Sequence, residues 1–118
     1  MRKVSGSAAG ALDVGSFSAR LVVLEPGGTP LAPALSHQTR LRLDRELNND
    51  CRLSPRGIAA ISAAVADGAT TAARHDVHNL FPFATSSIRD AANATEVVRR
   101  VRRDTGVELQ FLSGRREA

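Results

Sequence analysis

Residues 12–24, which read LDVGSFSARLVVL, decide the fold of this chain. The run from Ala11 to Val14 is short and mostly apolar, and the run from Leu21 to Leu24 is branched and apolar again, so both predict strands. Between them, Gly15 permits the positive φ or the close backbone approach that a tight turn needs. The stretch therefore predicts a strand, a glycine turn and a second strand.

The turn carries polar groups that suit an anion. Ser16 and Ser18 can donate hydrogen bonds, and successive backbone N–H groups in a tight turn form a concavity of partial positive charge. Asp13, at the mouth of the turn, would repel a bare anion but fits beside a hydrated cation that accompanies phosphate. Taken alone, the same residues also fit an ordinary hairpin turn, because short glycine motifs often occur by chance.

The composition is typical of one globular domain with a basic surface. The chain has 118 residues, of which 42% are hydrophobic and 24% charged, enough for a domain with its own core. Four Phe and no Trp or Tyr argue against the aromatic stacking platforms of single-stranded nucleic-acid binders. The formal net charge of +4 suits polyanions but does not choose among nucleic acid, nucleotides and polyphosphate.

The cysteine content and the hydropathy of the sequence indicate the cellular compartment in which we expect the protein. A single cysteine, Cys51, allows no intrachain disulfide and fits a reducing setting. The residues after Lys3 are too weakly apolar for a signal peptide, and no run approaches transmembrane length. We therefore expect a cytoplasmic protein without membrane association.

Ser54 and Pro55 begin a clear helix signal. Serine is a good N-cap, and proline is preorganised for the first helical position. The residues that follow on one face recur at three- and four-residue spacing, which predicts a helix as far as about Arg74. These apolar residues are Ile58, Ile61, Val65, Ala69 and Ala72.

Turn signals and caps predict the other elements. Asn93 can cap a helix, with Glu96 in a capping-box arrangement, and Gly106 stands where a helix C-terminal glycine belongs. In chain order, the remaining expected elements are a flexible lead-in at 1–9, a turn at 26–30, a half-exposed strand within 31–43, a loop at 45–52, a strand at 79–84, a polar turn at 85–90 and a last strand at 107–112.

The predicted order is strand, strand, strand, helix, strand, helix, strand. This βββαβαβ order predicts an α/β fold with a mixed five-stranded sheet and flanking helices. Polar turns follow three of the strands, at 13–18, 85–90 and 113–117. Because functional crevices of open α/β sheets lie outside the carboxyl ends of strands, we expect these three turns to share one rim.

Three motifs occur in one order along nearly the whole chain: LDVGSFSARL at 12–21, ATSSIRDAAN at 84–93, and TGVEL at 105–109 leading to SGRREA at 113–118. Together they resemble the exopolyphosphatase and guanosine pentaphosphate phosphatase family. The resemblance implies an actin-like, ribonuclease-H-like fold, of which residues 10–118 would be the amino-terminal domain. It also implies hydrolysis of the terminal phosphoanhydride of polyphosphate, or of the 5′ phosphate of guanosine pentaphosphate, with Mg²⁺.

The resemblance implies a role for each matched residue. Glu117 matches the glutamate that activates the attacking water, and Arg89 matches an arginine that contacts phosphate. Asp13 is the acidic start of the first phosphate loop and would hold the metal directly or through water. The phosphate-binding residues implied in this way are Gly15, Ser16, Ser18, Arg89, Ser113 and Gly114. Without the motifs, Arg89 reads as a surface ion pair with Asp90 or Glu96, and Glu117 as an exposed glutamate.

Three departures from the family pattern leave a second hypothesis open. Phe17 stands where the family usually has Asn, and Arg116 stands where it often has a first Glu. The second phosphate loop, with the carboxylate partner for the metal, is not found in these 118 residues, so we expect no turnover by this chain alone. The alternative is a non-catalytic or regulatory module that binds polyphosphate or nucleotide.

The expected partners follow from the same reading. A carboxyl-terminal lobe or a dimer partner would complete the site. Nucleic-acid binding would have to use the arginines between Asn93 and Gly106, and these are most simply a solvated helix face. The arginines are Arg99, Arg100, Arg102 and Arg103.

Overall fold

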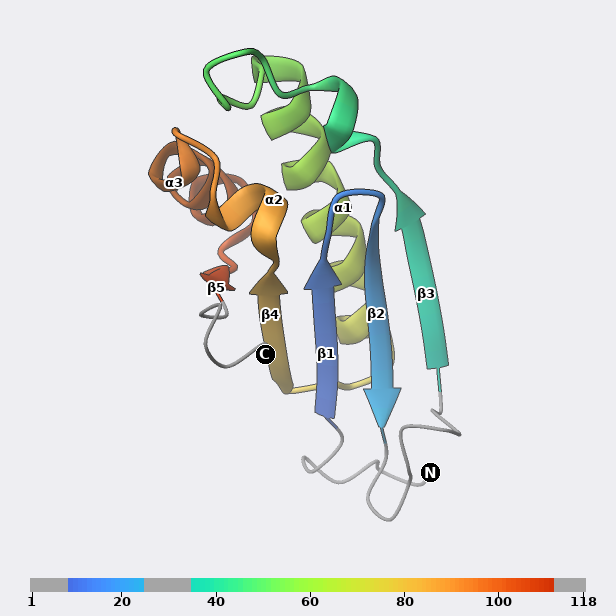
Figure 1. Cartoon of the computed structure of the whole chain (residues 1–118). Helices are drawn as coiled ribbons and strands as arrows, with labels where there is room; N and C mark the ends of the chain where they lie inside the picture. The colour runs from blue at the N-terminus through green and yellow to red at the C-terminus, as the bar shows by residue number, and fades with distance from the viewer. Residues whose placement is uncertain (1–8, 25–34, 112–118) are drawn as a thin grey trace, which may run out of the picture.

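Five strands form one sheet in the spatial order β3-β2-β1-β4-β5 in the computed structural model, which describes residues 9–24 and 35–111 (Figure 1). β1 pairs with β2 and β2 with β3 in antiparallel fashion, whereas β1 with β4 and β4 with β5 are parallel, so the sheet is mixed as predicted. The elements are β1 (Ala9–Val14), β2 (Ser18–Leu24), β3 (Leu35–Arg40), η1 (Leu43–Arg45), α1 (Pro55–Arg74), β4 (Asn79–Ala84), α2 (Ser86–Arg89), α3 (Ala94–Thr105) and β5 (Gln110–Phe111).

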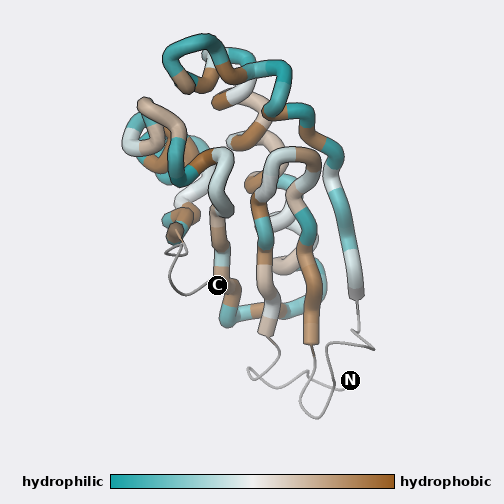
Figure 2. The backbone as a smooth tube through the Cα atoms, in the orientation of Figure 1, coloured by the Kyte–Doolittle hydropathy of each residue, from teal (hydrophilic) through white to brown (hydrophobic). Residues whose placement is uncertain are grey.

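Alternation along β1 and β2 gives the sheet two unlike faces. Leu12 lies opposite Leu21 and both are buried, whereas the next pair, Asp13 and Arg20, points to the other face and is exposed. Figure 2 shows hydrophobic residues along β1, β2 and β4, while the loop after β3 is mostly hydrophilic. The core therefore lies on one side of the sheet only.

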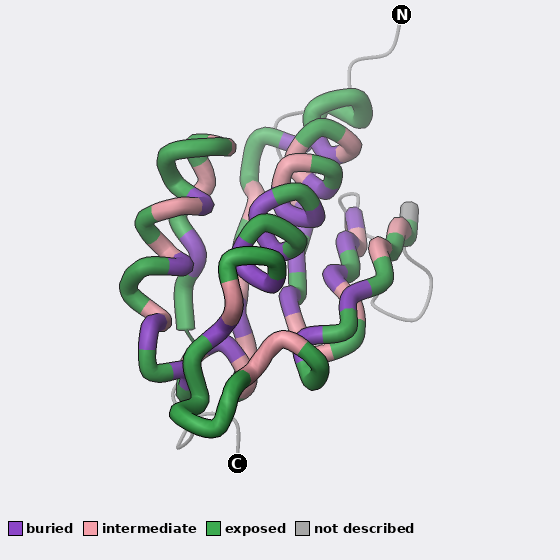
Figure 3. Tube along the Cα trace, turned by 90° about the horizontal axis from the view of Figure 1, so that it is seen from above, coloured by how far each residue is buried: buried purple, intermediate pink, exposed green. Residues whose placement is uncertain are grey.

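The helix α1 covers the buried face of the sheet. The Ser54 hydroxyl accepts a hydrogen bond from the Gly57 N–H at 3.0 Å, and Pro55 is the first helical residue, so the predicted start and end are both confirmed. Ile61 and Val65 are fully buried against β1, β2 and β3, while buried and exposed positions alternate around the helix (Figure 3). No helix in the described ranges is long and apolar enough to cross a membrane.

The helix α3 packs against α1 through Val97 and Val101. Gly106 ends it in the left-handed region at φ 77°, as expected from the sequence. The arginines of α3 lie on its outer side, where Arg100 donates to Asp104 at 2.6 Å and Arg102 pairs with Glu108 at 3.8 Å. All four arginines are exposed or half-exposed, as a solvated face requires.

Asn93 is the N-cap residue of α3, as predicted, but the expected capping hydrogen bond from its side chain is absent. The Asn93 side chain is buried, and instead its Oδ1 accepts from the Leu53 N–H at 2.9 Å while its Nδ2 donates to the Leu53 carbonyl at 3.0 Å. Tertiary contact with the segment before α1 outcompetes the local cap. Asn93 therefore joins two segments that are forty positions apart.

The structure corrects three further boundaries. The predicted polar turn at 85–90 contains the short helix α2, in which the Arg89 N–H donates to the Thr85 carbonyl at 3.0 Å and the buried Ile88 anchors the turn. Of the described part of the strand predicted at 107–112, β5 covers only Gln110 and Phe111, and Leu112 lies outside the described ranges. β1 begins at Ala9, one residue inside the expected lead-in, and residues 1–8 lie outside the described ranges.

Candidate phosphate-binding site

Two chain segments leave the sheet together at its upper edge in Figure 1. β1 and β4 are parallel and in register, with Val14 beside Ala84, so the glycine turn and the start of α2 emerge side by side. The Thr85 N–H donates to the Val14 carbonyl at 3.1 Å and ties the two together. β5 ends at the same level, because Phe111 pairs with Ala84. The predicted convergence of the first two polar turns is confirmed.

The tip of the β1–β2 hairpin is fixed by its backbone. The Gly15 N–H donates to the Ser18 carbonyl at 2.9 Å. The carbonyls of Ser16 and Phe17 accept from the N–H groups of Leu43 at 2.9 Å and Leu41 at 2.7 Å. Within the described ranges, the N–H groups of Ser16 and Phe17 have no acceptor. They are therefore available to an anion.

A hollow of about 350 Å³ lies beside this hairpin tip. Its lining brings together the predicted Asp13, Gly15, Ser16 and Ser18, and adds Thr85 from the β4–α2 turn. We call these five residues the polar rim. The rest of the lining is Phe17, Arg20 and Gln38. The rim offers hydroxyl donors and free backbone N–H groups to phosphate oxygens, beside one carboxylate.

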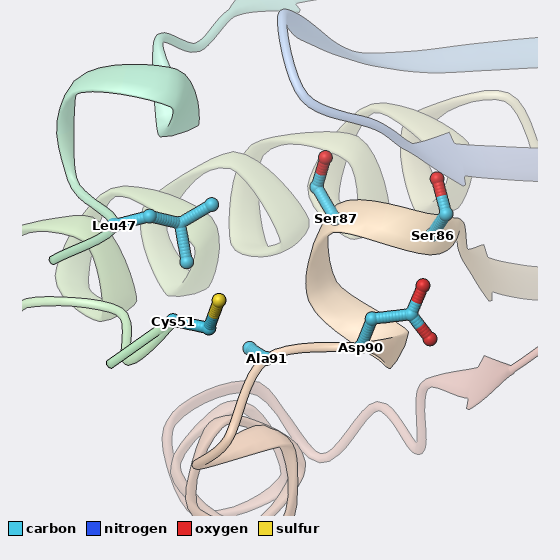
Figure 4. Close-up of a pocket in the computed structure, with 6 residues that line it drawn as sticks. All are labelled: Leu47, Cys51, Ser86, Ser87, Asp90 and Ala91. Carbon is cyan, nitrogen blue, oxygen red and sulfur yellow. The ribbon is translucent and has the colours of Figure 1, made fainter. Parts of the chain in front are cut away.

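A second hollow, of about 260 Å³, lies on the α2 side of the rim and is drawn in Figure 4. The Ser87 hydroxyl is hydrogen-bonded to the Ser16 hydroxyl and so links α2 to the hairpin. Cys51 faces this hollow from the loop after η1, where it is exposed and adopts φ 59°. The Cys51 carbonyl accepts from the Ala92 N–H at 2.8 Å, so the loop is fastened to the α2–α3 connection.

Arg89 lies at the last position of α2 and does not line the polar-rim hollow. Its Nε donates to Asp90 Oδ1 at 3.1 Å, and its side chain is 22% exposed. This is the ion pair with Asp90 that the sequence left open. The predicted role of Arg89 in phosphate binding stays a prediction.

Three predicted site residues, Ser113, Gly114 and Glu117, lie outside the described ranges. Their predicted roles therefore stay predictions. The last described residue before them, Phe111, stands at the edge from which the glycine turn and α2 leave the sheet.

The donor set of the rim suits a cation only in part. In the part of the chain that the structure describes, no three His, Cys, Asp or Glu side chains gather into a metal site. Asp13 is the one carboxylate on the rim, beside the hydroxyls of Ser16, Ser18 and Thr85. Mg²⁺ is commonly held by one or two carboxylates, with water and phosphate oxygens as the other ligands. Asp13 fits such a metal when a phosphate ligand accompanies it.

Sequence reasoning did not single out two residues near the rim that the turn into α2 supplies. Thr85 lines the rim and Ser87 contacts Ser16, and the only signal in the sequence was that both belong to the polar run after β4. Gln38 joins the lining because β3 pairs with β2, with Gln38 opposite Arg20. No local pattern around Gln38 indicates this.

The fold defines a class of protein: an actin-like α/β domain whose first hairpin carries a glycine turn at the edge of the sheet. Residues 22–118 match the model of the Ppx/GppA phosphatase family. The chain belongs to this family.

Two proteins to which the chain is similar are much longer than the chain itself. It is 38% identical over 111 residues to Exopolyphosphatase 1 of Mycobacterium tuberculosis and 35% identical over 107 residues to Exopolyphosphatase 1 of Mycobacterium leprae. These alignments cover 92% and 89% of this chain but only 32% and 31% of the relatives. The chain therefore spans about a third of the length of these proteins.

Solved structures confirm the fold. The crystal structure of the Aquifex aeolicus Ppx/GppA family member superposes with a TM-score of 0.82 at 23% identity, over 93% of this chain and 36% of that one. An exopolyphosphatase from Cytophaga hutchinsonii also gives 0.82, at 14% identity over 94% and 36% of the two chains. At such identities the likeness concerns the fold alone.

Proposed function

We propose that this chain is the amino-terminal, phosphate-binding domain of a phosphatase that hydrolyses the terminal phosphoanhydride bond of polyphosphate. The observation that carries the proposal is the meeting of the glycine turn and the β4–α2 turn in one hollow, lined by Asp13, Ser16, Ser18 and Thr85. Polyphosphate is the preferred substrate because the Mycobacterium relatives are named exopolyphosphatases. Guanosine pentaphosphate, with a role in the bacterial stringent response, stays a prediction from the resemblance.

In this proposal the rim binds and orients the terminal phosphate. The hydroxyls of Ser16 and Ser18 and the free N–H groups of the turn donate to its oxygens, which places donors where negative charge grows during phosphoryl transfer. The Thr85 hydroxyl donates to the Val14 carbonyl at 3.4 Å and would have to leave it to join them. Asp13 would hold Mg²⁺ together with phosphate oxygens, and the metal would neutralise phosphate charge. Glu117 acts as general base toward the attacking water, and Arg89, Ser113 and Gly114 complete the phosphate contacts.

Phosphate binding and phosphoanhydride hydrolysis can be tested separately. We expect calorimetric titration with polyphosphate and Mg²⁺ to show binding that Ser16→Ala weakens roughly tenfold, the effect of losing one hydrogen bond to a charged group. Ser36→Ala, an exposed serine on β3, is the matched control and should leave the affinity unchanged. Equal affinities for wild type and Ser16→Ala would exclude the rim as the phosphate site.

Hydrolysis is expected only when a carboxyl-terminal lobe is supplied, in a cytoplasmic enzyme. Orthophosphate release by this chain alone, abolished by Glu117→Gln, would contradict that expectation. The second candidate, a non-catalytic binding module, is favoured by Phe17, whose apolar ring is 60% exposed at the rim. Polyphosphate binding without hydrolysis, even with the second lobe present, would support the module.

A further inference from the structure

A third hollow, of about 360 Å³, adjoins the polar rim on the β3 side of the hairpin tip. Phe17, Ser18 and Gln38 line both this hollow and the one at the rim, so the two are neighbours that share a wall. The other lining residues come from the end of β3 and the segment after it. They are Arg40, Leu41 and Arg42, and we call this space the arginine hollow.

Two of its side chains are braced against each other. The guanidinium carbon of Arg42 lies 5.9 Å from the centre of the Phe17 ring, within cation–π range. Asp44 accepts two hydrogen bonds from Arg42, at 3.0 and 2.8 Å, and this hydrogen bonding holds the pKa of the Asp44 carboxyl below its ordinary value. The charge of Arg42 is thus largely compensated by Asp44, and its guanidinium lies over the ring.

Arg40 is in a different situation. It is exposed at the last position of β3, directly across the strands from Ser18 of the rim. Among the described residues, no acidic group lies within 4 Å of its guanidinium. Arg40 therefore brings an uncompensated positive charge beside the rim, next to the Gln38 amide.

We propose that the arginine hollow binds phosphates further along a linear polyphosphate chain whose terminal phosphate lies at the polar rim. Arg40 pairs with their oxygens, the Gln38 amide donates a hydrogen bond, and the braced Phe17–Arg42 pair forms the wall. A polyanion fits better than a nucleobase, because Arg42 already covers a face of the ring on which a base would stack. The inference rests on the proposed function, since it assumes a terminal phosphate at the rim.

The test compares a long and a short ligand. Titrations of the 118-residue chain use polyphosphate of many units and pyrophosphate, each with Mg²⁺. For Arg40→Gln we expect roughly tenfold weaker binding of polyphosphate, the effect of losing a charge-assisted contact, and unchanged binding of pyrophosphate. The matched control is Arg99→Gln, which removes the same charge from an exposed position on α3. It should change neither affinity.

The outcomes separate this inference from the proposed function. Unchanged polyphosphate affinity in Arg40→Gln, with Ser16→Ala still weakening both ligands, would overturn the arginine hollow and leave the rim intact. An equal loss for Arg40→Gln and Arg99→Gln would also overturn it, because general surface charge would then suffice. If Ser16→Ala changes neither ligand, the proposed function fails first.

Titration with guanosine triphosphate tests whether a nucleobase, rather than polyphosphate, binds in the arginine hollow. Phe17→Leu removes the aromatic face but keeps an apolar side chain. If this variant weakens binding of guanosine triphosphate while Arg40→Gln leaves polyphosphate unaffected, the hollow is a nucleobase site and the inference is wrong. If Phe17→Leu leaves guanosine triphosphate binding unchanged, the polyphosphate assignment stands.

Discussion

The two faces of the sheet are built by the same strands and behave differently. Leu12, Val14 and Leu21 point toward α1 and are at most 1% exposed. Asp13 and Arg20, one position away, point to the face on which no described element packs. Strand alternation thus places a dry core and a polar, ligand-facing surface within one residue of each other.

The open face of the sheet has a polar part near the rim and an apolar part further from it. Near the polar rim it carries Asp13, Arg20 and Gln38, whereas further down Ala11 lies between Phe81 of β4 and Val22 of β2. Phe81 is 53% exposed, although it is a large apolar side chain. The comparison teaches that burial in this domain depends on where the helices lie and not on how apolar a strand is.

Replacing Leu21 by Ala tests the covered face and should have the largest effect. A fully buried leucine reduced to alanine leaves a cavity beneath α1, so we expect a loss of about 2–5 kcal/mol in the free energy of unfolding. Urea denaturation measures it. Phe81→Ala, on the open face, should cost about 1 kcal/mol or less. If both variants lose the same free energy of unfolding, Phe81 is covered in solution, and the contrast between the covered and the open face is wrong.

Replacing Asn93 by Ala sharpens the comparison for polar groups. It leaves the buried Leu53 N–H and carbonyl without their partners, so we expect a loss of about 2–3 kcal/mol, measured by the same denaturation. Gln38→Ala, which removes an exposed amide from the open face, should stay within about 0.5 kcal/mol. A loss of less than about 1 kcal/mol in Asn93→Ala would show that its two hydrogen bonds are replaced by water.

The smallest effect is expected from pH. Asp104 accepts from Arg100 at 2.6 Å and from Ser62 of α1 at 2.8 Å, and these hydrogen bonds lower the pKa of its carboxyl. A lowered folded-state pKa contributes stability that is present above the unfolded value, about 3.9, and is lost as pH falls through the folded value.

Thermal melts at pH 7 and in steps below pH 4 would measure this contribution. Asp104→Asn should lose part of the acid dependence seen in the wild type. The control Asp50→Asn changes an exposed carboxyl whose oxygens have no partner within the described ranges, and it should keep the wild-type profile. If Asp104→Asn and wild type follow the same pH curve, the α1–α3 link through Asp104 does not stabilise the fold.

Much of the fold could be predicted from local patterns. The helix from Pro55 to Arg74 was bounded correctly because its N-cap serine, its proline and its apolar stripe all act within one helix. The turn at 85–90 was not, because burial of Ile88 in the tertiary structure stabilises the mostly polar run Ser86–Arg89 as the helix α2. Asn93 failed in the same way, since its partner Leu53 is distant in sequence.

The residues of the candidate site also fall into those that local sequence patterns predict and those that only tertiary contacts bring in. Asp13, Gly15, Ser16 and Ser18 could be predicted because they are neighbours in one hairpin turn. Thr85, Gln38 and Arg40 could not, because parallel pairing of β1 with β4 and antiparallel pairing of β2 with β3 bring them to the rim and the arginine hollow. The pairing of Arg89 with Asp90 agrees with the local reading of the sequence, and its phosphate role, which comes from the motif, stays a prediction.

By itself, the sequence determined the order of the strands and of the two long helices, the glycine turn and its polar groups, because hydrophobic period and turn chemistry act over a few residues. Only the tertiary structure decided which face of the sheet is buried, which second turn completes the rim and that Arg40 stands beside it without an acidic partner among the described residues. These depend on strand register and helix placement, which join residues far apart in the chain.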